Sequence, residues 1–107
     1  MNAELQHGKK IVERLSEKVT LKMFQIGCDS TNYGILQSLP LTAGEIEQKI
    51  DLTPMPTNKR INDLMEVRLV SREKAGEKIK LTLFGKDFLK LVEDIKEKVI
   101  RQMAEMI

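Results

Sequence analysis

The residues best suited to chemistry in this sequence lie in the stretch LTPMPTNKRINDLMEVRLV, residues 52–70. Short polar and basic side chains follow two prolines there, and a series of regularly spaced apolar residues follows them. The polar and basic residues are Thr57, Asn58, Lys59, Arg60 and Asn62. Hydroxyls, amides and cations of this kind hydrogen-bond the edges of nucleic-acid bases and the oxygens of phosphates. On a helix they would form a polar front suited to reading a nucleic acid.

A second group of basic residues follows in the stretch VSREKAGEKIKLTL, residues 70–83. Apolar and polar side chains alternate there after a turn that contains glycine, which predicts a two-stranded hairpin with one apolar and one basic face. Lysines on such a hairpin neutralise phosphates or reach a minor groove, and they also protect a free strand edge from aggregation, so both interpretations stay open. The basic candidates are Arg72, Lys74, Lys78 and Lys80.

Charge is distributed unevenly along the chain, although the formal net charge is only +2. Residues 54–83 carry more basic than acidic side chains, whereas residues 43–53 are net acidic. A locally basic element in a nearly neutral protein favours contact with a nucleic acid. An ordinary solvated surface would carry the same charges, so charge alone leaves both interpretations open.

The sequence offers no group of residues typical of an enzyme. It contains no nucleophile–base pair, no phosphate-binding glycine loop and no cluster of metal ligands. His7 and Cys28 are its soft metal ligands, too few for a site within one chain, although a site shared between two chains stays open. Cys28 follows a helix break and is either inert packing or a redox switch. We predict no enzymatic activity, no metal and no cofactor.

Length and composition predict one globular domain. The chain has 107 residues, of which 32% are charged and 41% are hydrophobic. No apolar run approaches the roughly 20 residues that span a bilayer, and the opening MNAELQHGKK lacks the apolar core of a secretory signal. A single cysteine fits a reducing compartment. We therefore expect no membrane contact and a cytoplasmic location.

The chain up to residue 50 predicts three helices. Apolar residues at helical spacing predict a long amphipathic helix over residues 3–26, ended by a break at residues 27–30. Asp29 or Ser30 is placed to cap a second helix, which Pro40 ends. Thr42 and Glu45 have the spacing of a capping box and begin a third helix that runs to Ile50. The stripe of the first helix is made of Leu5, Val12, Leu15, Val19, Met23 and Ile26.

The quoted stretch predicts a fourth helix over residues 56–68. Proline costs nothing in a first helical turn, because the missing N–H would have no partner there, and the pre-proline restriction on Met55 favours a start at Pro56. Helical spacing then gives an inner face with Thr57, Ile61, Leu64 and Arg68, and an outer face with Lys59, Asn62, Asp63 and Glu66.

The hairpin is followed by one more predicted helix. Its strands are expected to carry Val70 and then Ile79, Leu81 and Leu83 on the apolar face. Thr82 or Gly85 opens a last helix over residues 84–107, with apolar residues close to a heptad spacing. They are Phe88, Val92, Ile95, Val99 and Met106.

Residues 52–70 resemble the turn and recognition helix of winged-helix transcriptional regulators, which typically read leucine-serine-proline-serine-threonine-valine-serine and end on glycine-leucine-valine. The stretch aligns without a gap. Arg68 stands where the family usually has glycine, and Thr57 stands at a usually apolar valine position. The stretch IKLTLFGKDFLKLV resembles the end of the wing in MarR-, ArsR- and PadR-like regulators, with Leu81, Thr82 and Gly85 on marker positions. The resemblance covers residues 33–92, and the hairpin lacks the aspartate-arginine-arginine signature of MarR proteins.

The resemblance implies a mainly α fold with a small β-hairpin wing (α+β), a winged helix-turn-helix with long N- and C-terminal helices. Residues 1–107 would form one domain, with dimerisation helices at 1–27 and 84–107 around a winged-helix core at 29–83. It implies a transcriptional regulator that reads the major groove of double-stranded DNA with helix 56–68 and contacts phosphates or the minor groove with the wing at 70–83.

The apolar stripes of both terminal helices are wider than a compact winged domain can cover, which predicts a homodimer on a pseudo-palindromic site. Whether a small-molecule effector binds is not predicted. An alternative is a winged helix that serves protein–protein interaction or assembly without specific DNA binding. RNA binding is a further alternative. It is the weaker one, because it relies on aromatic residues that stack on bases and these are scarce in the sequence.

Overall fold

The computed structural model describes the backbone of residues 3–107 and the side chains from Gln6 onward, so the predicted stripe residue Leu5 lies outside the described side chains. The protein is mainly helical, with one two-stranded antiparallel sheet, and this α+β class agrees with the sequence prediction. In chain order the elements are α1 (Ala3–Gly27), α2 (Ser30–Ser38), α3 (Ala43–Ile50), α4 (Pro54–Glu66), β1 (Val70–Ser71), β2 (Lys80–Leu81) and α5 (Leu83–Met106).

The starts of α2 and α3 are set by local capping, as predicted. The Asp29 carboxylate accepts hydrogen bonds from the backbone N–H groups of Thr31 and Asn32 at the start of α2. Thr42 and Glu45 form both bonds of a capping box at the start of α3. Each cap satisfies helix N–H groups that have no partner within the helix.

The predicted bounds of α4, residues 56–68, were wrong at both ends. The helix begins at Pro54, and its first hydrogen bond runs from the Thr57 N–H to the Thr53 carbonyl. Both prolines therefore precede every residue whose N–H the helix needs, and Met55 adopts the helical conformation despite the proline that follows it.

The last turn of α4 closes with a left-handed residue. The helix ends at Glu66, and Arg68 has a φ of 64°. The Arg68 N–H bonds the Met65 carbonyl and the Leu69 N–H bonds the Leu64 carbonyl, which is the Schellman pattern. The prediction that Arg68 lies on the inner face with Leu64 was therefore wrong, because the helix stops before it and its side chain is exposed.

The hairpin is short, and its second arm is bonded to the connection between α2 and α3. Val70 pairs with Leu81 and Ser71 with Lys80, and Gly76 turns the loop with a φ of 89°. On the loop side of these pairs, Leu41 and Ile79 exchange two backbone hydrogen bonds of 3.2 and 2.7 Å, which join the α2–α3 connection to the second arm of the hairpin.

The second arm ends earlier than predicted. Leu83 was expected on the apolar face of the strand, but it is the first residue of α5 and is exposed. Thr82 caps this helix by accepting a bond from the Gly85 N–H. Of the two candidates for the start of α5, Thr82 is the cap, and the strand pattern therefore stops at Leu81.

One apolar core lies where the three middle helices, the hairpin and the start of α5 meet. Its buried members include the apolar residues Ile61 and Leu64 of α4 and one apolar residue from each arm of the hairpin, Val70 and Ile79, as the sequence predicted. They are Ile35, Leu36, Ile46, Ile61, Leu64, Val67, Leu69, Val70, Ile79 and Phe88. The last turn of α1 joins this core through Phe24, whose ring packs edge-on against Phe88 at 5.3 Å between centroids.

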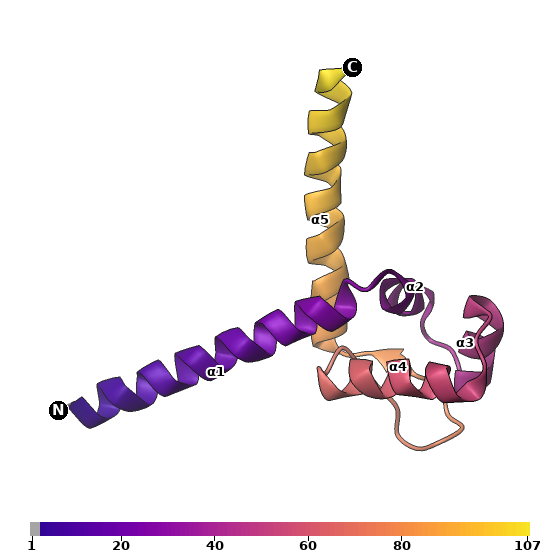
Figure 1. The fold of residues 1–107 in the computed structure, drawn as a ribbon, viewed down its shortest axis with the longest axis horizontal. Helices are drawn as coiled ribbons and strands as arrows, with labels where there is room; N and C mark the ends of the chain where they lie inside the picture. Colours follow the sequence, from indigo (N-terminus) through magenta and orange to yellow (C-terminus); the bar gives the residue numbers. More distant parts are fainter. Residues whose placement is uncertain (1–2) are drawn as a thin grey trace.

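The two long helices leave this core in different directions. Figure 1 shows α1 projecting to one side and α5 projecting upward, with most of each helix touching no other element. The radius of gyration is 17.4 Å, whereas a compact chain of this length has about 13 Å. Exposed apolar residues therefore cover the free lengths of both helices. On α1 they are Ile11, Val12, Leu15, Val19 and Leu21, and on α5 they are Leu91, Ile95, Val99, Ile100, Met103 and Met106.

Within residues 3–107, neither long helix has an apolar stretch of the length that crossing a bilayer requires.

Candidate nucleic-acid interface

The outer face of α4 forms an open surface at one end of the molecule. Pro54, Met55, Asn58, Lys59, Asn62 and Asp63 line a shallow hollow on it. Asn58, Lys59 and Asn62 are exposed, as a reading face requires. The structure therefore brings three of the five predicted residues of this helix together on one surface.

Lys59 is paired on this face, but weakly. Its Nζ lies 3.2 Å from Asp63 Oδ2, one helical turn away, and 76% of the lysine side chain remains exposed. Such a surface pair contributes about 0.3–0.5 kcal/mol. The ammonium is therefore available to a stronger anion such as a phosphate.

Arg60 does not lie on this outer face. Its Nη1 donates to Asp29 Oδ1 at 2.8 Å and to Asn32 Oδ1 at 3.0 Å. Asn32 is buried, and its Nδ2 donates to the Ile26 carbonyl in the last turn of α1. The guanidinium joins α4 to the α1–α2 junction and is 31% exposed there, so a DNA contact through Arg60 stays a prediction.

The Asp29 carboxylate is held in its charged form by this arrangement. The backbone N–H of Asn32 lowers the pKa of Asp29 most, and the charge and hydrogen bond of Arg60 lower it further. A charged carboxylate at a helix start also interacts favourably with the positive end of the helix dipole. Asp29 thus serves both as the cap of α2 and as the anchor of Arg60.

Thr57 is also removed from the predicted site. It is completely buried on the inner face with Ile61 and Leu64. Its Oγ1 has no hydrogen-bond partner in the part of the chain that the structure describes. A DNA contact through Thr57 is therefore wrong, because the helical periodicity places it in the core.

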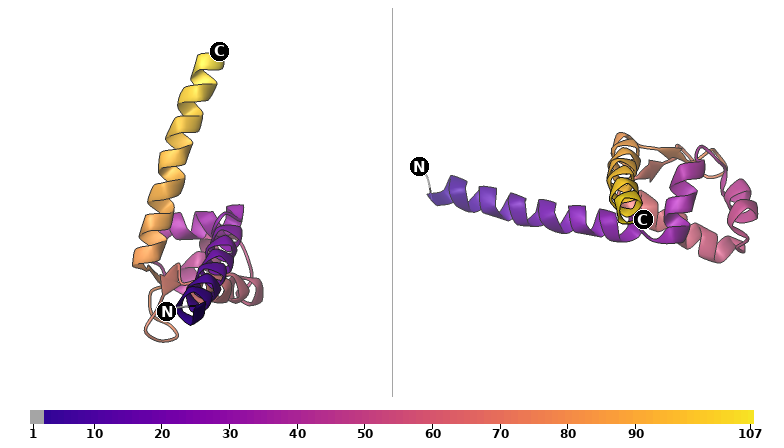
Figure 2. Two further views of the ribbon diagram at one scale, coloured as in Figure 1. Left: turned by 90° about the vertical axis from the view of Figure 1, so that its left-hand side faces the viewer. Right: turned by 90° about the horizontal axis from the view of Figure 1, so that it is seen from above.

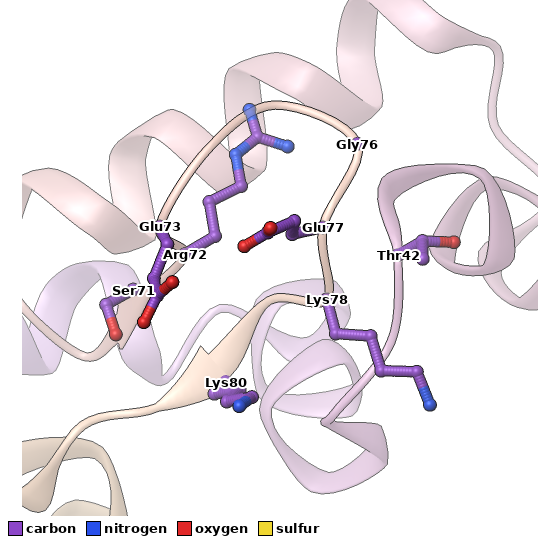
Figure 3. A pocket seen from close by; sticks show the side chains of 8 residues that line it. All are labelled: Thr42, Ser71, Arg72, Glu73, Gly76, Glu77, Lys78 and Lys80. Atoms are coloured by element: carbon purple, nitrogen blue, oxygen red, sulfur yellow. The ribbon is translucent and has the colours of Figure 1, made fainter.

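The hairpin loop holds the second group of predicted residues. Figure 3 shows the Arg72 and Glu77 side chains between the two arms of the loop, whereas Lys78 points away from it. Lys78 and Lys80 are exposed, and Lys74 lies 3.9 Å from Glu77 while remaining mostly exposed. The lysines are therefore the accessible cations of the hairpin, and Arg72 is the least exposed of the four.

The loop and α4 lie at the same end of the molecule. Figures 1 and 2 show the loop extending past α4 on the side opposite the free end of α5. Helix α4 and the hairpin loop therefore lie at the same end of the molecule, away from the free end of α5.

Sequence reasoning missed Met55, which lies on the same outer face and is 83% exposed. The available signal was its spacing, three residues before Asn58 and seven before Asn62, which places all three on one side of a helix. It also missed Asp29 and Asn32 as partners of Arg60, for which no local pattern exists.

Neither residue considered for metal or redox chemistry lies in a ligand cluster. Cys28 is an exposed free thiol after the last turn of α1, which contradicts its interpretation as inert packing. His7 is exposed on the free part of α1. Among the residues that the structure describes, no three His, Cys, Asp or Glu side chains converge on a common point.

Comparison with known proteins gives a similarity of fold. No protein-family model and no curated protein matches the sequence. Among solved structures, the chain is similar to the crystal structure of RV1404 from Mycobacterium tuberculosis, with a TM-score of 0.62 and 13% sequence identity. The match covers 100% of this chain and 82% of that chain. At this identity the match shows a shared fold alone.

Proposed function

We propose that this protein is a dimeric DNA-binding transcriptional regulator that acts in the cytoplasm. The observation that carries the proposal is the outer face of α4, the second of two consecutive short helices, on which Asn58, Lys59 and Asn62 are exposed. The basic hairpin loop lies at the same end of the molecule (Figure 1). The second helix of such a pair lies in the major groove, with the residues of its first turns at the base edges.

The side chains divide into two roles. Asn58 and Asn62 are one helical turn apart, and an amide bonds the N6 and N7 edge of adenine in a bidentate way. Lys78 and Lys80 on the hairpin, with Lys74 near its tip, are suited to phosphates, which position a protein without reading sequence. In this proposal the helix supplies specificity and the wing supplies salt-sensitive affinity.

The dimer rests on the free lengths of α1 and α5. Each helix would leave its exposed apolar stripe in contact with water if the chain were alone. A second copy with the same two stripes covers them by two-fold symmetry. Each dimer would then present two α4 faces to one duplex.

The decisive experiment is selection from a random duplex library with the purified full-length protein. The proposal predicts an enriched pseudo-palindrome with half-site centres about 34 Å apart along the helix axis. Weak, salt-sensitive binding without an enriched motif would reject sequence-specific regulation and favour a winged helix that mediates protein–protein interaction.

Light scattering tests the dimer separately. The full chain should be dimeric at tens of micromolar, and a shortened chain ending at Glu93 should lose stability and dimer content together. A monomeric full-length protein, or a shortened chain that remains an equally stable dimer, would reject the role assigned to α5.

A further inference from the structure

The leading turn of α4 is apolar, although it begins the face that we assign to DNA reading. Pro54, Met55 and Pro56 are all exposed, and Met55 is 83% exposed. Met55 lies in the first turn of α4 and belongs to neither of the stripes of α1 and α5. We call these three residues the apolar tip of α4. Because the rest of this face is polar, the tip is suited to a ligand that presents an apolar group beside polar ones.

This tip is poorly suited to a phosphate. The first residues of a helix normally offer several free N–H groups to an anion. Pro54 and Pro56 have no N–H, the Thr57 N–H is bonded to the Thr53 carbonyl, and the Thr53 side chain makes no capping bond. Among residues 54–57, Met55 therefore has the one backbone N–H that is free to bind a ligand. A ligand at this turn would be contacted mainly by side chains.

Met55 is aligned with the two amides. It precedes Asn58 by three residues and Asn62 by seven, and the same hollow is lined by all three. The long, unbranched thioether side chain adapts to irregular apolar surfaces. In the major groove the apolar group at a base edge is the C5 methyl of thymine.

We propose that Met55 is a specificity-determining residue that contacts a thymine methyl group in each half-site. This inference rests on the proposed function, since it assumes that α4 lies in the major groove. Together with Asn58 and Asn62, it makes the outer face of α4 a reader of A·T pairs, with the methyl read at the leading end of the helix.

Replacement of thymidine by deoxyuridine tests the inference, because it removes only the methyl group. Each thymidine of the library-selected duplex is replaced in turn, and affinity is measured by fluorescence anisotropy with the wild-type protein, Met55→Ala and Met55→Leu. One position per half-site should weaken wild-type binding about four-fold, which corresponds to about 0.8 kcal/mol for one buried methyl.

At that position Met55→Ala should bind thymidine and deoxyuridine equally, and Met55→Leu should keep most of the discrimination. Gln102 is exposed on α5 and belongs to neither the reading face nor the apolar stripe, so Gln102→Ala is a control that should keep the wild-type ratio. Circular dichroism verifies that each variant is folded, as expected for changes at exposed sites.

The outcomes separate the two proposals. A selected motif with no deoxyuridine-sensitive position, or a sensitivity that Met55→Ala retains, overturns the role of Met55 and leaves sequence-specific binding intact. A selection that yields no motif overturns the proposed function and this inference with it.

Discussion

Arg60 Nη1 lies 2.8 Å from Asp29 Oδ1, which joins the middle of α4 to the start of α2. The two residues are 31 positions apart in the sequence. The same nitrogen also satisfies the buried Asn32. This contact fixes the orientation of α4 relative to α1 and α2, so Arg60 acts on the outer face by positioning the helix.

Replacing Arg60 by Ala should therefore lower the free energy of unfolding by about 1–3 kcal/mol, because it leaves the buried Asn32 oxygen without its donor. Urea unfolding measures this decrease. Lys59→Ala is the matched control and should change stability by less than about 0.5 kcal/mol, since its ion pair is exposed. Equal effects of the two variants would contradict the positioning role.

Asp29 should make stability depend on pH in the acid range. Its pKa is lowered in the folded protein, chiefly by the Asn32 N–H, and is about 3.9 in an unfolded chain. The contribution is therefore complete above about pH 4 and is lost as the pH falls through the folded pKa. The stability difference between wild type and Asp29→Asn should be largest near neutral pH and shrink below about pH 4. A difference that stays constant during acid titration of urea unfolding would reject this assignment.

Thr57→Val should stabilise the protein. The hydroxyl is buried without a partner among the described residues, and valine replaces it with a methyl of similar volume. We expect a gain of about 1 kcal/mol, the lower end of the cost of an unsatisfied buried polar group. Thr57→Ser keeps the hydroxyl and removes the methyl, so it should lose stability. Thermal unfolding that ranks serine above valine would show that the hydroxyl is bonded in solution.

Arg68→Gly should also stabilise the fold, because glycine adopts the left-handed conformation without a Cβ clash. The strain relieved is about 1 kcal/mol, reduced by the greater freedom of glycine in the unfolded chain. Arg68→Ala removes the same side chain but keeps the Cβ, and it should give no such gain. If alanine stabilises as much as glycine, side-chain charge explains the effect and backbone strain does not.

Asn62→Ala and Lys78→Ala should affect DNA binding differently. Asn62→Ala should cost about 1–3 kcal/mol on the selected site and relax preference at one position per half-site. Lys78→Ala should weaken binding to selected and scrambled duplexes alike, and it should lower the salt slope by about one for each phosphate that is no longer neutralised. Affinity measured against salt on both duplexes distinguishes them. Identical behaviour of the two variants would show that this face of α4 does not read bases.

The sequence predicted what depends on neighbours along the chain. The capping box of Thr42 and Glu45 spans three residues, so residue types and spacing were sufficient to find it. The inner face of α4 followed in the same way from helical periodicity. That periodicity already placed Thr57 beside Ile61, and assigning Thr57 to DNA gave more weight to its residue type than to its position.

What the sequence could not predict depends on tertiary contacts. The partner of Arg60 lies in another helix, and an arginine beside Asn58 and Lys59 looks like a member of the same polar front. The end of α4 was misplaced because apolar spacing continues through Leu69, whereas the backbone reverses at Arg68. The resemblance carried a signal here, since a glycine position marks a left-handed residue.

The two backbone bonds between Leu41 and Ile79 have a consequence for the cost of binding. A hairpin attached only through its own strands would have to be ordered against the helices whenever it met a ligand. Here the second arm of the hairpin is already fixed to the α2–α3 connection at Ile79, so the conformational entropy of its orientation is removed during folding. Only the loop at residues 72–78 is left to adapt. Shortening or lengthening that loop should therefore change the affinity of the hairpin for its ligand and leave the orientation of the hairpin relative to the helices unchanged.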